Sequence, residues 1–359
     1  MRRHFILAKR FFPMVNETRS QVAAGTVAGR KASRESLEDS AEQKIMNPRL
    51  SFGMPVYNGE HFVSEALDSL LAQTFQDFEI VIADNASTDR TGEICRSYAS
   101  RDPRIRYFRN DKNIGAAGNH NLVVERSTGE FFMWMSHDDI CIPTYVENCV
   151  AILEKDPGIV LCYSKTGDIE EHGLALQRDN LHRQLSVESD RLNTDSPHAH
   201  IRFRDLIRLD HQCEAMYGVV RANVLKGTPV HGNYADADRV LLAELGLYGR
   251  FYVIPDYLFL HREHALRSVE LHPSRQERTV WMDPTAAGKI LLPHFRQLSE
   301  LILCLQRTPL PAKMRFLCYG HLIKWTFTNR KRFFSDASVA TVQLLRRFRR
   351  DKQGPLAQT

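Results

Sequence analysis

The chain has 359 residues, a net charge of +5, and ordinary apolar (43%) and charged (25%) fractions. These values are typical of a globular protein with roughly two domains, or one domain with appendages. No uninterrupted apolar run is long enough to cross a bilayer. The seven cysteines are odd in number and form no CxxC pair. This pattern argues against a disulfide framework or a zinc knuckle and favours a reduced, cytoplasmic setting.

Charge is unevenly distributed along the chain. Between Lys313 and Lys352, eleven Lys and Arg stand against two Asp, so the rest of the chain is slightly acidic. Residues 1–47 start with a short basic apolar stretch and continue without periodicity, which predicts a flexible basic N-terminal tail. The apolar stretch Phe5–Ala8 is too short for a signal peptide. The basic surplus therefore lies away from the part of the chain that carries chemical motifs.

Strands and helices are predicted to alternate from residue 50 onward. Apolar runs predict strands at 50–54, 78–83, 105–108, 131–135 and 159–163. Helical periodicity predicts helices at 60–73, 88–99, from 113–121 to about 126, and 143–154. This alternation predicts an α/β, Rossmann-like fold with a mostly parallel central sheet and helices on both faces.

The second half of the chain is less regular. A long polar excursion at 167–200 is typical of a lid or an acceptor loop. Helices are predicted at 201–209 and 237–247, and strands at 214–221, 251–254 and 258–261. After Pro273 the pattern is helical at 284–304, 313–328 and 336–350, which predicts a basic C-terminal helical extension.

The stretch Gly129–Asp139 is the part of the sequence from which the predicted site is argued. A large apolar run, Phe131 to Met135, stops at two adjacent carboxylates, Asp138 and Asp139. Ligands of open α/β sheets gather beyond the carboxyl ends of the strands, and a carboxylate pair there suits a hard cation held against phosphate oxygens. Two solvated loop acids, or a helix N-cap, are the alternatives.

Polar groups also follow two other predicted strands, Tyr57-Asn58 after the first and Asp84-Asn85 after the second. In a parallel sheet these groups converge on one edge, where a nucleotide would sit. Asp84 could instead cap a loop. The backbone N–H groups of Asn113–Gly118 at a helix start suit phosphate, or form a plain turn.

Four motifs in this order resemble the inverting, nucleotide-sugar-dependent family 2 glycosyltransferases of the GT-A fold. The motifs are Pro55-x-Tyr57-Asn58, Asp84-Asn-x-Ser-x-Asp-x-Thr91, Asn113-x-Gly115 with Asn121, and Ser136-His-Asp138-Asp139. The resemblance covers about residues 50–267. It implies a catalytic domain at 48–272, with a nucleotide-binding half at 48–163 and an acceptor half at 164–272, followed by the helical extension at 273–352.

The resemblance also implies roles for single residues. Pro55, Tyr57 and Asn58 would lie along the nucleotide, Asp84 would bind its base, and Asn113 and Gly115 would help to hold the donor. Asp138 and Asp139 would bind Mg²⁺ or Mn²⁺, with Ser136 in place of the usual first acid. Asp238 matches the catalytic base, and Asp236 is close enough to be that base. Arg262 and His264 would lie near the diphosphate, with His264 as a further metal ligand.

The chemistry explains why carboxylates are needed at two places. An acceptor hydroxyl is a poor nucleophile, so a carboxylate must take its proton, while a cation offsets the charge on the leaving diphosphate. Asp238 could instead be an N-cap, and His261 with His264 lacks a third ligand for zinc. A catalytically degenerate binding or assembly subunit is supported only by Ser136. A sugar nucleotidyltransferase lacks its usual Gly-rich, Arg-containing loop, and a dehydrogenase lacks GxGxxG after the first strand.

The expected partners follow from the same resemblance. The donor would be a UDP, GDP or TDP sugar, and the acceptor a glycan or a lipid-linked molecule. The basic, aromatic-rich C-terminal helices predict peripheral contact with the inner face of a membrane, or else a solvated face packed on the catalytic domain. No nucleic-acid partner is expected, because the basic surplus is not on the predicted cleft.

Overall fold

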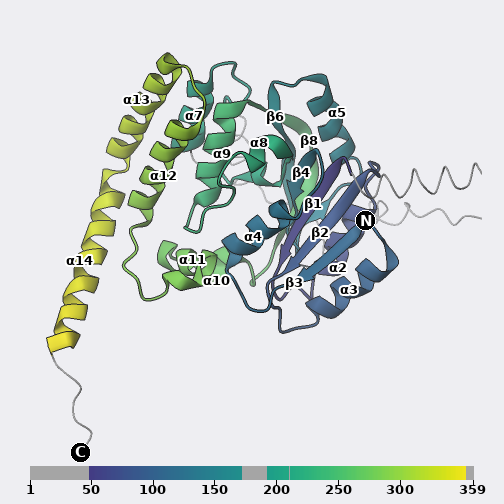
Figure 1. Ribbon diagram of the computed structural model, residues 1–359, viewed down its shortest axis with the longest axis horizontal. Coiled ribbons are helices and arrows are strands. Elements are labelled where there is room, and N and C mark those ends of the chain that lie inside the picture. Colours follow the sequence, from purple (N-terminus) through teal and green to yellow (C-terminus); the bar gives the residue numbers. More distant parts are fainter. Residues whose placement is uncertain (1–47, 172–191, 210, 353–359) are drawn as a thin grey trace, which may run out of the picture. The chain divides into compact units, whose positions relative to one another are not determined.

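The computed structural model describes residues 48–171, 192–209 and 211–352 (Figure 1). Its centre is an eight-stranded sheet in the order β3-β2-β1-β4-β7-β6-β8-β5. Strands β5 and β7 run antiparallel to their neighbours, and every other pairing is parallel. The strands are β1 Leu50–Val56, β2 Phe78–Asp84, β3 Ile105–Arg109, β4 Phe131–Trp134, β5 Ile140–Cys141, β6 Ile159–Glu170, β7 Val219–Arg221 and β8 Arg250–Glu263. The predicted α/β class with a mostly parallel sheet is confirmed.

Helices cover both faces of the sheet, as predicted (Figure 1). Successive residues of β4 point to opposite faces, so Phe131 and Met133 join one apolar core while Phe132 and Trp134 join another. The first core includes α2 and α5, and the second includes α4, α7 and α9. The helices of this part are α2 Val63–Leu71, α3 Thr91–Arg101, α4 Ala116–Glu125, α5 Tyr145–Lys155, α7 Ala199–Arg208, α8 Ala222–Lys226 and α9 Ala237–Tyr248.

Further helices follow β8 in the described part of the chain, and the last three of them share the second core. The helices after β8 are α10 Ser268–Leu271, α11 Arg275–Met282, α12 Pro293–Arg307, α13 Ala312–Thr328 and α14 Arg330–Lys352. Leu301 and Leu305 of α12 and Trp325 of α13 are buried in the same cluster as α9. The Arg307 guanidinium also forms a bidentate ion pair with the buried Glu244 carboxylate of α9. One side of the helical extension is therefore packed on the rest of the fold.

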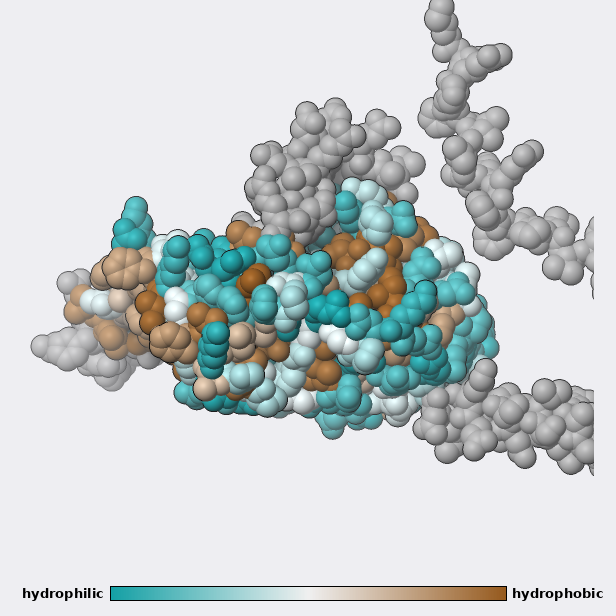
Figure 2. All heavy atoms as spheres, turned by 90° about the horizontal axis from the view of Figure 1, so that it is seen from above, coloured by the Kyte–Doolittle hydropathy of each residue, from teal (hydrophilic) through white to brown (hydrophobic). Residues whose placement is uncertain are grey.

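The other side of the extension exposes large apolar side chains. Phe316, Phe327 and Phe334 are 77%, 71% and 71% exposed. Apolar side chains are visible at the left end of Figure 2, the end at which α14 lies in Figure 1. Within the described part of the chain, no helix has the length and hydropathy needed to span a bilayer.

Several predicted boundaries differ from the observed ones. The predicted strand at 214–221 is short, because Glu214–Tyr217 forms a 3-10 turn, η1, before β7. The predicted strands at 251–254 and 258–261 are one strand, β8, which pairs with β6 as far as Glu170. Tertiary pairing therefore extends a strand into the predicted polar excursion, where the local sequence gives a weak signal. The predicted tail at 1–47 and most of that excursion, 172–191, lie outside the described residues.

The cysteines contribute to the apolar interior and form no disulfides. All seven cysteines are buried and unpaired, which agrees with the absence of a disulfide framework. Burial raises the pKa of the Cys95 thiol to about 12, so this side chain behaves as a small apolar group rather than a nucleophile.

Candidate active site

A pocket of about 230 Å³ opens where β1, β2 and β4 end. Its lining includes four of the residues predicted to hold a nucleotide sugar, Pro55, Tyr57, Asn113 and Asp138, together with Ser136. Pro55 and Tyr57 lie at the end of β1, and the others come from the loops that follow β3 and β4. The convergence predicted for the carboxyl edge of the sheet is therefore present, and we call this cavity the nucleotide pocket.

Asparagine side chains tie the start of α4 to the pocket wall. The Asn85 amide donates to Asn113 Oδ1 (3.0 Å), and its carbonyl oxygen accepts from the Ile114 N–H (2.9 Å). The backbone turns at Gly115 with φ +85°, and a Cβ there would lie 2.3 Å from the Met282 carbonyl oxygen. Only glycine fits this conformation and this close contact. Gly115 thus shapes the wall, and Asn113 contributes a side chain to it.

Asp84 lies behind the pocket and is fully buried. Its Oδ1 accepts from the Ser87 N–H (2.8 Å), while Oδ2 accepts from the Tyr107 hydroxyl (2.6 Å) and Arg109 Nη1 (2.8 Å). Burial acts to raise the pKa of this carboxyl, but the hydrogen bonds from Ser87, Tyr107 and Arg109 outweigh it and lower the pKa. Both oxygens therefore serve to join β2 to β3 and to the following loop.

The acidic pair lies immediately after β4. Asp138 lines the nucleotide pocket, and its Oδ2 accepts from His264 Nε2 (2.9 Å). The Leu266 N–H donates to His264 Nδ1 (3.3 Å), so Nε2 carries the ring proton of the neutral tautomer. Asp139 is fully buried, and its Oδ1 accepts from the Arg262 N–H (3.0 Å) and pairs with His261 Nδ1 (3.0 Å).

Histidine side chains and the acidic pair influence one another's charge. Burial opposes a charged His261 ring, but the Asp139 carboxylate outweighs it and raises the pKa of His261 to about 9. Burial likewise acts to raise the pKa of Asp138, yet His137, His264 and His261 lower it well below the usual range. The site therefore concentrates negative charge at the pocket mouth and balances part of it from β8.

Arg262 holds the acidic turn from behind. The guanidinium is fully buried and donates to the Asp138 carbonyl oxygen (2.8 Å), the Glu171 carbonyl oxygen (2.7 Å) and the Glu65 carboxylate (2.6 Å). Its Cζ also lies 5.0 Å from the centre of the Phe62 ring. In this arrangement Arg262 positions the acids and does not line the pocket.

The acidic pair has the donor set that a hard cation requires. Asp139 Oδ2 is buried and has no hydrogen-bond partner, and Asp138 Oδ1 has no partner among the described residues. Across all the residues that the structure describes, no group of three or more His, Cys, Asp or Glu is arranged to ligate a metal. One or two carboxylates plus phosphate oxygens are how Mg²⁺ is usually held. The residues therefore fit a cation whose coordination is completed by a phosphate ligand.

The two candidate bases differ in their surroundings. Asp236 has φ +63° and forms an ion pair with Arg275 of α11 (2.6 Å). Asp238 lies in the first turn of α9, is half-buried, and accepts from the Arg239 N–H (2.8 Å). Neither side chain lines the nucleotide pocket. The two acids therefore differ in that an ion pair holds Asp236, whereas a backbone N–H donates to Asp238.

Tyr217 is influenced by the charges of the acidic pair and of Asp238, and its local sequence carries no motif that indicates this. Its ring lines the nucleotide pocket and stacks on Phe259 (5.0 Å), and its hydroxyl accepts from Ser136 Oγ (3.3 Å). Burial and then the charges of Asp139, Asp138 and Asp238 raise the pKa of Tyr217. The three acids therefore act on one side chain. Sequence reasoning also missed His272 and Trp281, which line the same pocket, whereas Asn85 lines it as its position at a strand end predicted.

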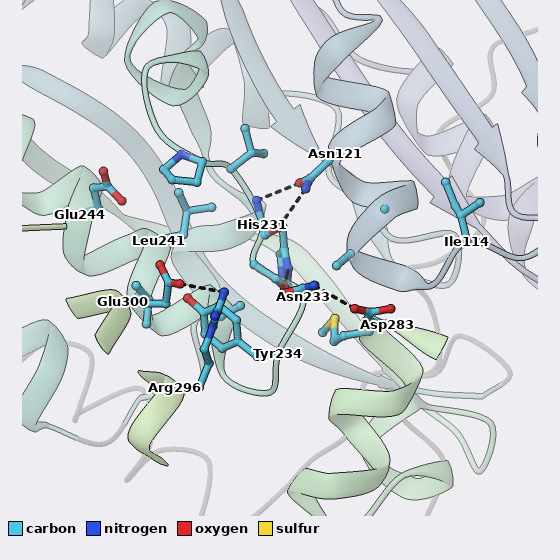
Figure 3. Close-up of a pocket in the computed structure, with 18 of the residues that line it drawn as sticks. Ile114, Asn121, His231, Asn233, Tyr234, Leu241, Glu244, Asp283, Arg296 and Glu300 are labelled. Carbon is cyan, nitrogen blue, oxygen red and sulfur yellow. Dashed lines mark hydrogen bonds and ion pairs between the residues drawn. The ribbon is translucent and has the colours of Figure 1, made fainter. Parts of the chain in front are cut away.

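A second cavity of about 430 Å³ lies on the other side of α4, between the loop 229–234, α9 and α12 (Figure 3). Asn121 exchanges two hydrogen bonds of 2.9 Å with the His231 backbone, and Asn233 donates to Asp283 (2.9 Å). Arg296 pairs with Glu300 (2.9 Å) beside the Tyr234 ring. The His231 and His120 rings, 5.2 Å apart, line this cavity and the nucleotide pocket respectively.

Together the fold and site define an α/β protein with a pocket at the carboxyl edge of its sheet, the edge at which such folds bind ligands. Residues 51–209 match the sequence profile of glycosyl transferase family 2. Over these residues the match agrees with the resemblance predicted from the four motifs, and the observed sheet agrees with the predicted α/β fold.

Similar curated proteins are named glycosyltransferases. An uncharacterised glycosyltransferase of Rickettsia typhi is 36% identical over 136 residues, which is 37% of this chain and 42% of the relative. Glycosyltransferase GlyG of Streptococcus pneumoniae is 32% identical over 117 residues, 32% of this chain and 39% of the relative. The chain spans less than half the length of these two relatives.

Similar solved structures include residues 1–349 of TarS from S. aureus, with 17% identity and a TM-score of 0.48, covering 83% of this chain and 91% of that one. Mannosyltransferase PcManGT from Pyrobaculum calidifontis, solved with GDP-Man and Mn²⁺, has 18% identity and a TM-score of 0.44, covering 89% of this chain and 96% of that one.

The hydrogen bonds of Asp84 predict a pH-dependent loss of stability on substitution. Asp84→Asn removes a buried charge from Tyr107 and Arg109, and we expect it to lower the free energy of unfolding by about 2 kcal/mol at pH 7. Because the folded pKa lies below the unfolded value of about 4, the advantage of aspartate falls as pH drops from about 4 through the folded pKa. Urea unfolding of both proteins at neutral and acidic pH measures this. A difference that does not change with pH would contradict the assignment.

Proposed function

We propose that the chain is an inverting glycosyltransferase that moves a sugar from a nucleoside-diphosphate sugar to an acceptor hydroxyl. The observation that carries the proposal is an acidic pair within the residues that match the family 2 profile: Asp138 lines the nucleotide pocket, and the adjacent, buried Asp139 has an Oδ2 without a hydrogen-bond partner. Such a pair, at the carboxyl edge of a parallel sheet, suits the diphosphate of the donor.

The mechanism follows from where the side chains lie. Pro55 and Tyr57 form the wall against which the nucleotide would rest, and Asn113 offers a polar contact at the start of α4. Asp138 and Asp139 would hold Mg²⁺ or Mn²⁺, which when bound supplies charge compensation for the leaving diphosphate. His264 and Arg262 keep the acids in place from β8. The Ser136 and Tyr217 hydroxyls offer hydrogen bonds where the usual first acid would be.

Asp238 is our choice for the base. It takes the proton of the acceptor hydroxyl as the oxygen attacks the anomeric carbon, and the bond to the diphosphate breaks on the opposite face. This single displacement inverts the anomeric centre. Asp236 supports it by fixing α11 through Arg275. The alternative, a catalytically degenerate binding subunit, would need the pocket but would not need Asp238 as a base.

Exchanging the two candidate bases tests the mechanism. Asp238→Asn should lower the rate of sugar transfer by about 10²–10⁴-fold, because the acceptor proton has no carboxylate to receive it. Asp236→Asn, the matched control, should cost much less. Nucleotide release from a panel of UDP, GDP and TDP sugars measures turnover, and calorimetry measures donor binding, which both variants should retain. A larger loss of turnover in Asp236→Asn than in Asp238→Asn would make Asp236 the base. If the unmodified chain transferred sugar to none of the acceptors tested, the degenerate binding subunit would be favoured.

Removal of the cation gives a separate test of the acidic pair. We expect chelation to lower turnover and Mn²⁺ or Mg²⁺ to restore it, and Asp138→Asn to lower turnover at least about a hundredfold even with excess metal. Asp256→Asn, an exposed position on β8, is the control and should be unaffected. Full activity of Asp138→Asn with chelator present would remove the metal from the mechanism.

The proposal extends to the membrane face of the chain. Phe316, Ile323 and Phe327 recur along α13 at spacings of seven and four, so they form one exposed apolar stripe, which Phe334 of α14 continues. Lys324, Arg330 and Lys331 flank this stripe. Aromatic side chains between basic ones suit the interface of an anionic bilayer. We propose that α13 and α14 lie on the inner face of a membrane and bring the site close to a membrane-bound acceptor.

Vesicle binding tests this contact. The triple variant Phe316→Ser, Phe327→Ser and Phe334→Ser should weaken binding to phosphatidylglycerol vesicles by about tenfold per phenylalanine, because each loses a buried ring. Phe295→Ser, a less exposed phenylalanine on α12, serves as the control. Co-sedimentation at low and high salt measures the effect. Equal binding of the triple variant and the control would contradict the membrane role.

A further inference from the structure

An apolar groove lies next to the nucleotide pocket. It has a volume of about 680 Å³ and is bounded by α11, the 3-10 turn η2 (Pro284–Ala286) and one residue of α14. Its walls are formed mainly by the side chains of Val280, Pro284, Ala286 and Leu291. The carboxylate of Glu277, the one acid in the lining, accepts a hydrogen bond from the Ser274 N–H in a capping box. The groove therefore favours an apolar occupant.

The groove and the nucleotide pocket share a wall. His272 and Trp281 line both cavities, and their rings are stacked with centroids 5.7 Å apart. Trp281 is held on α11, which is also fixed by the ion pair between Arg275 and Asp236. A molecule with a polar end in the pocket can therefore lay an attached chain into the groove by passing one pair of rings.

The surface beside the groove continues its apolar character. Gln343 of α14 lines the groove, and its helical neighbours Val342, Leu344 and Leu345 are 46%, 56% and 55% exposed. Lys289 adds a positive charge to the lining. An apolar chain arriving from a bilayer along α14 would remain in contact with apolar side chains, whereas a water-soluble glycan would gain nothing from Val280, Pro284 or Leu291.

We propose that this groove binds the apolar chain of the acceptor, so that the acceptor is an amphiphile with a hydroxyl-bearing head and a hydrocarbon tail. The inference rests on the proposed function, since it assigns the acceptor class of that reaction. The head reaches the nucleotide pocket past His272 and Trp281, and the tail is held between α11, η2 and α14. The groove thus selects a lipid-linked acceptor over a free glycan.

Chain-length dependence of binding is the direct test. Butyl, hexyl and octyl glucoside, used below their micelle-forming concentrations, carry the same head on longer tails. We expect affinity by calorimetry to rise about fourfold for each added methylene, as for a chain that enters an apolar site. Val280→Asn and Leu291→Asn should each flatten this rise. Val342→Asn makes the same chemical change as the first variant outside the groove and should leave the rise intact.

Each other result would overturn the proposal. Equal affinity across the series would show that the groove does not bind the alkyl chain. A rise in affinity with chain length that Val280→Asn and Leu291→Asn both retain, while still folded, would show the same. If Val342→Asn flattened the dependence on chain length as much as the groove variants do, the alkyl chains would bind to the exposed surface of α14 instead of the groove. A dimer that dissociates in Val280→Asn, with no chain-length dependence, would assign the groove to a second copy. Because binding needs neither donor nor turnover, an inactive transferase would still show the rise, whereas active transfer without it would overturn only the groove.

Discussion

Burial of the Asp139 carboxylate against β8 is the constraint on which the site depends. A buried charge is costly unless it is paired and hydrogen-bonded, and here both kinds of partner come from one strand end. The Arg262 N–H and the His261 ring bind Asp139, while the Arg262 guanidinium binds the Asp138 carbonyl oxygen. The acidic turn is therefore fixed on one side by β4 and on the other by β8. This leaves Asp138 directed into the pocket and one oxygen of Asp139 without a partner.

The parts of the site that follow strand ends could be predicted from the sequence. A buried apolar run that stops at Asp138 and Asp139 is visible without any structure, and parallel strands bring such ends together. The predicted positions of Pro55, Tyr57 and Asn113 at the same pocket follow from this rule. The roles of these residues toward a ligand remain predictions, because geometry alone places a side chain without showing what it binds.

The parts that depend on distant pairing could not be predicted. Tyr217 lies in a 3-10 turn, and nothing in its local sequence indicates that it meets Ser136. Arg262 was expected near the diphosphate, yet its contact with Glu65, 197 positions away, buries it behind the acids. Asp84 has the strand-end position of a nucleotide ligand, but Tyr107 and Arg109 of the next strand occupy its oxygens. In each case a long-range contact that the sequence does not reveal sets the surroundings of the residue, while its predicted role toward the nucleotide stays a prediction.

The helical extension is part of the site as well as of the core. Trp281 of α11 lines the nucleotide pocket, and Arg275 of the same helix forms an ion pair with Asp236 and so distinguishes two acids that the sequence left equivalent. Charge is also unevenly distributed along the chain, with a basic surplus at the C-terminus and a slightly acidic remainder. An anionic surface would attract α13 and α14 and repel the rest, so electrostatics alone would turn the exposed phenylalanines toward the lipid. Since α14 also lines the apolar groove, the same orientation would carry a membrane-bound chain toward the wall it shares with the nucleotide pocket.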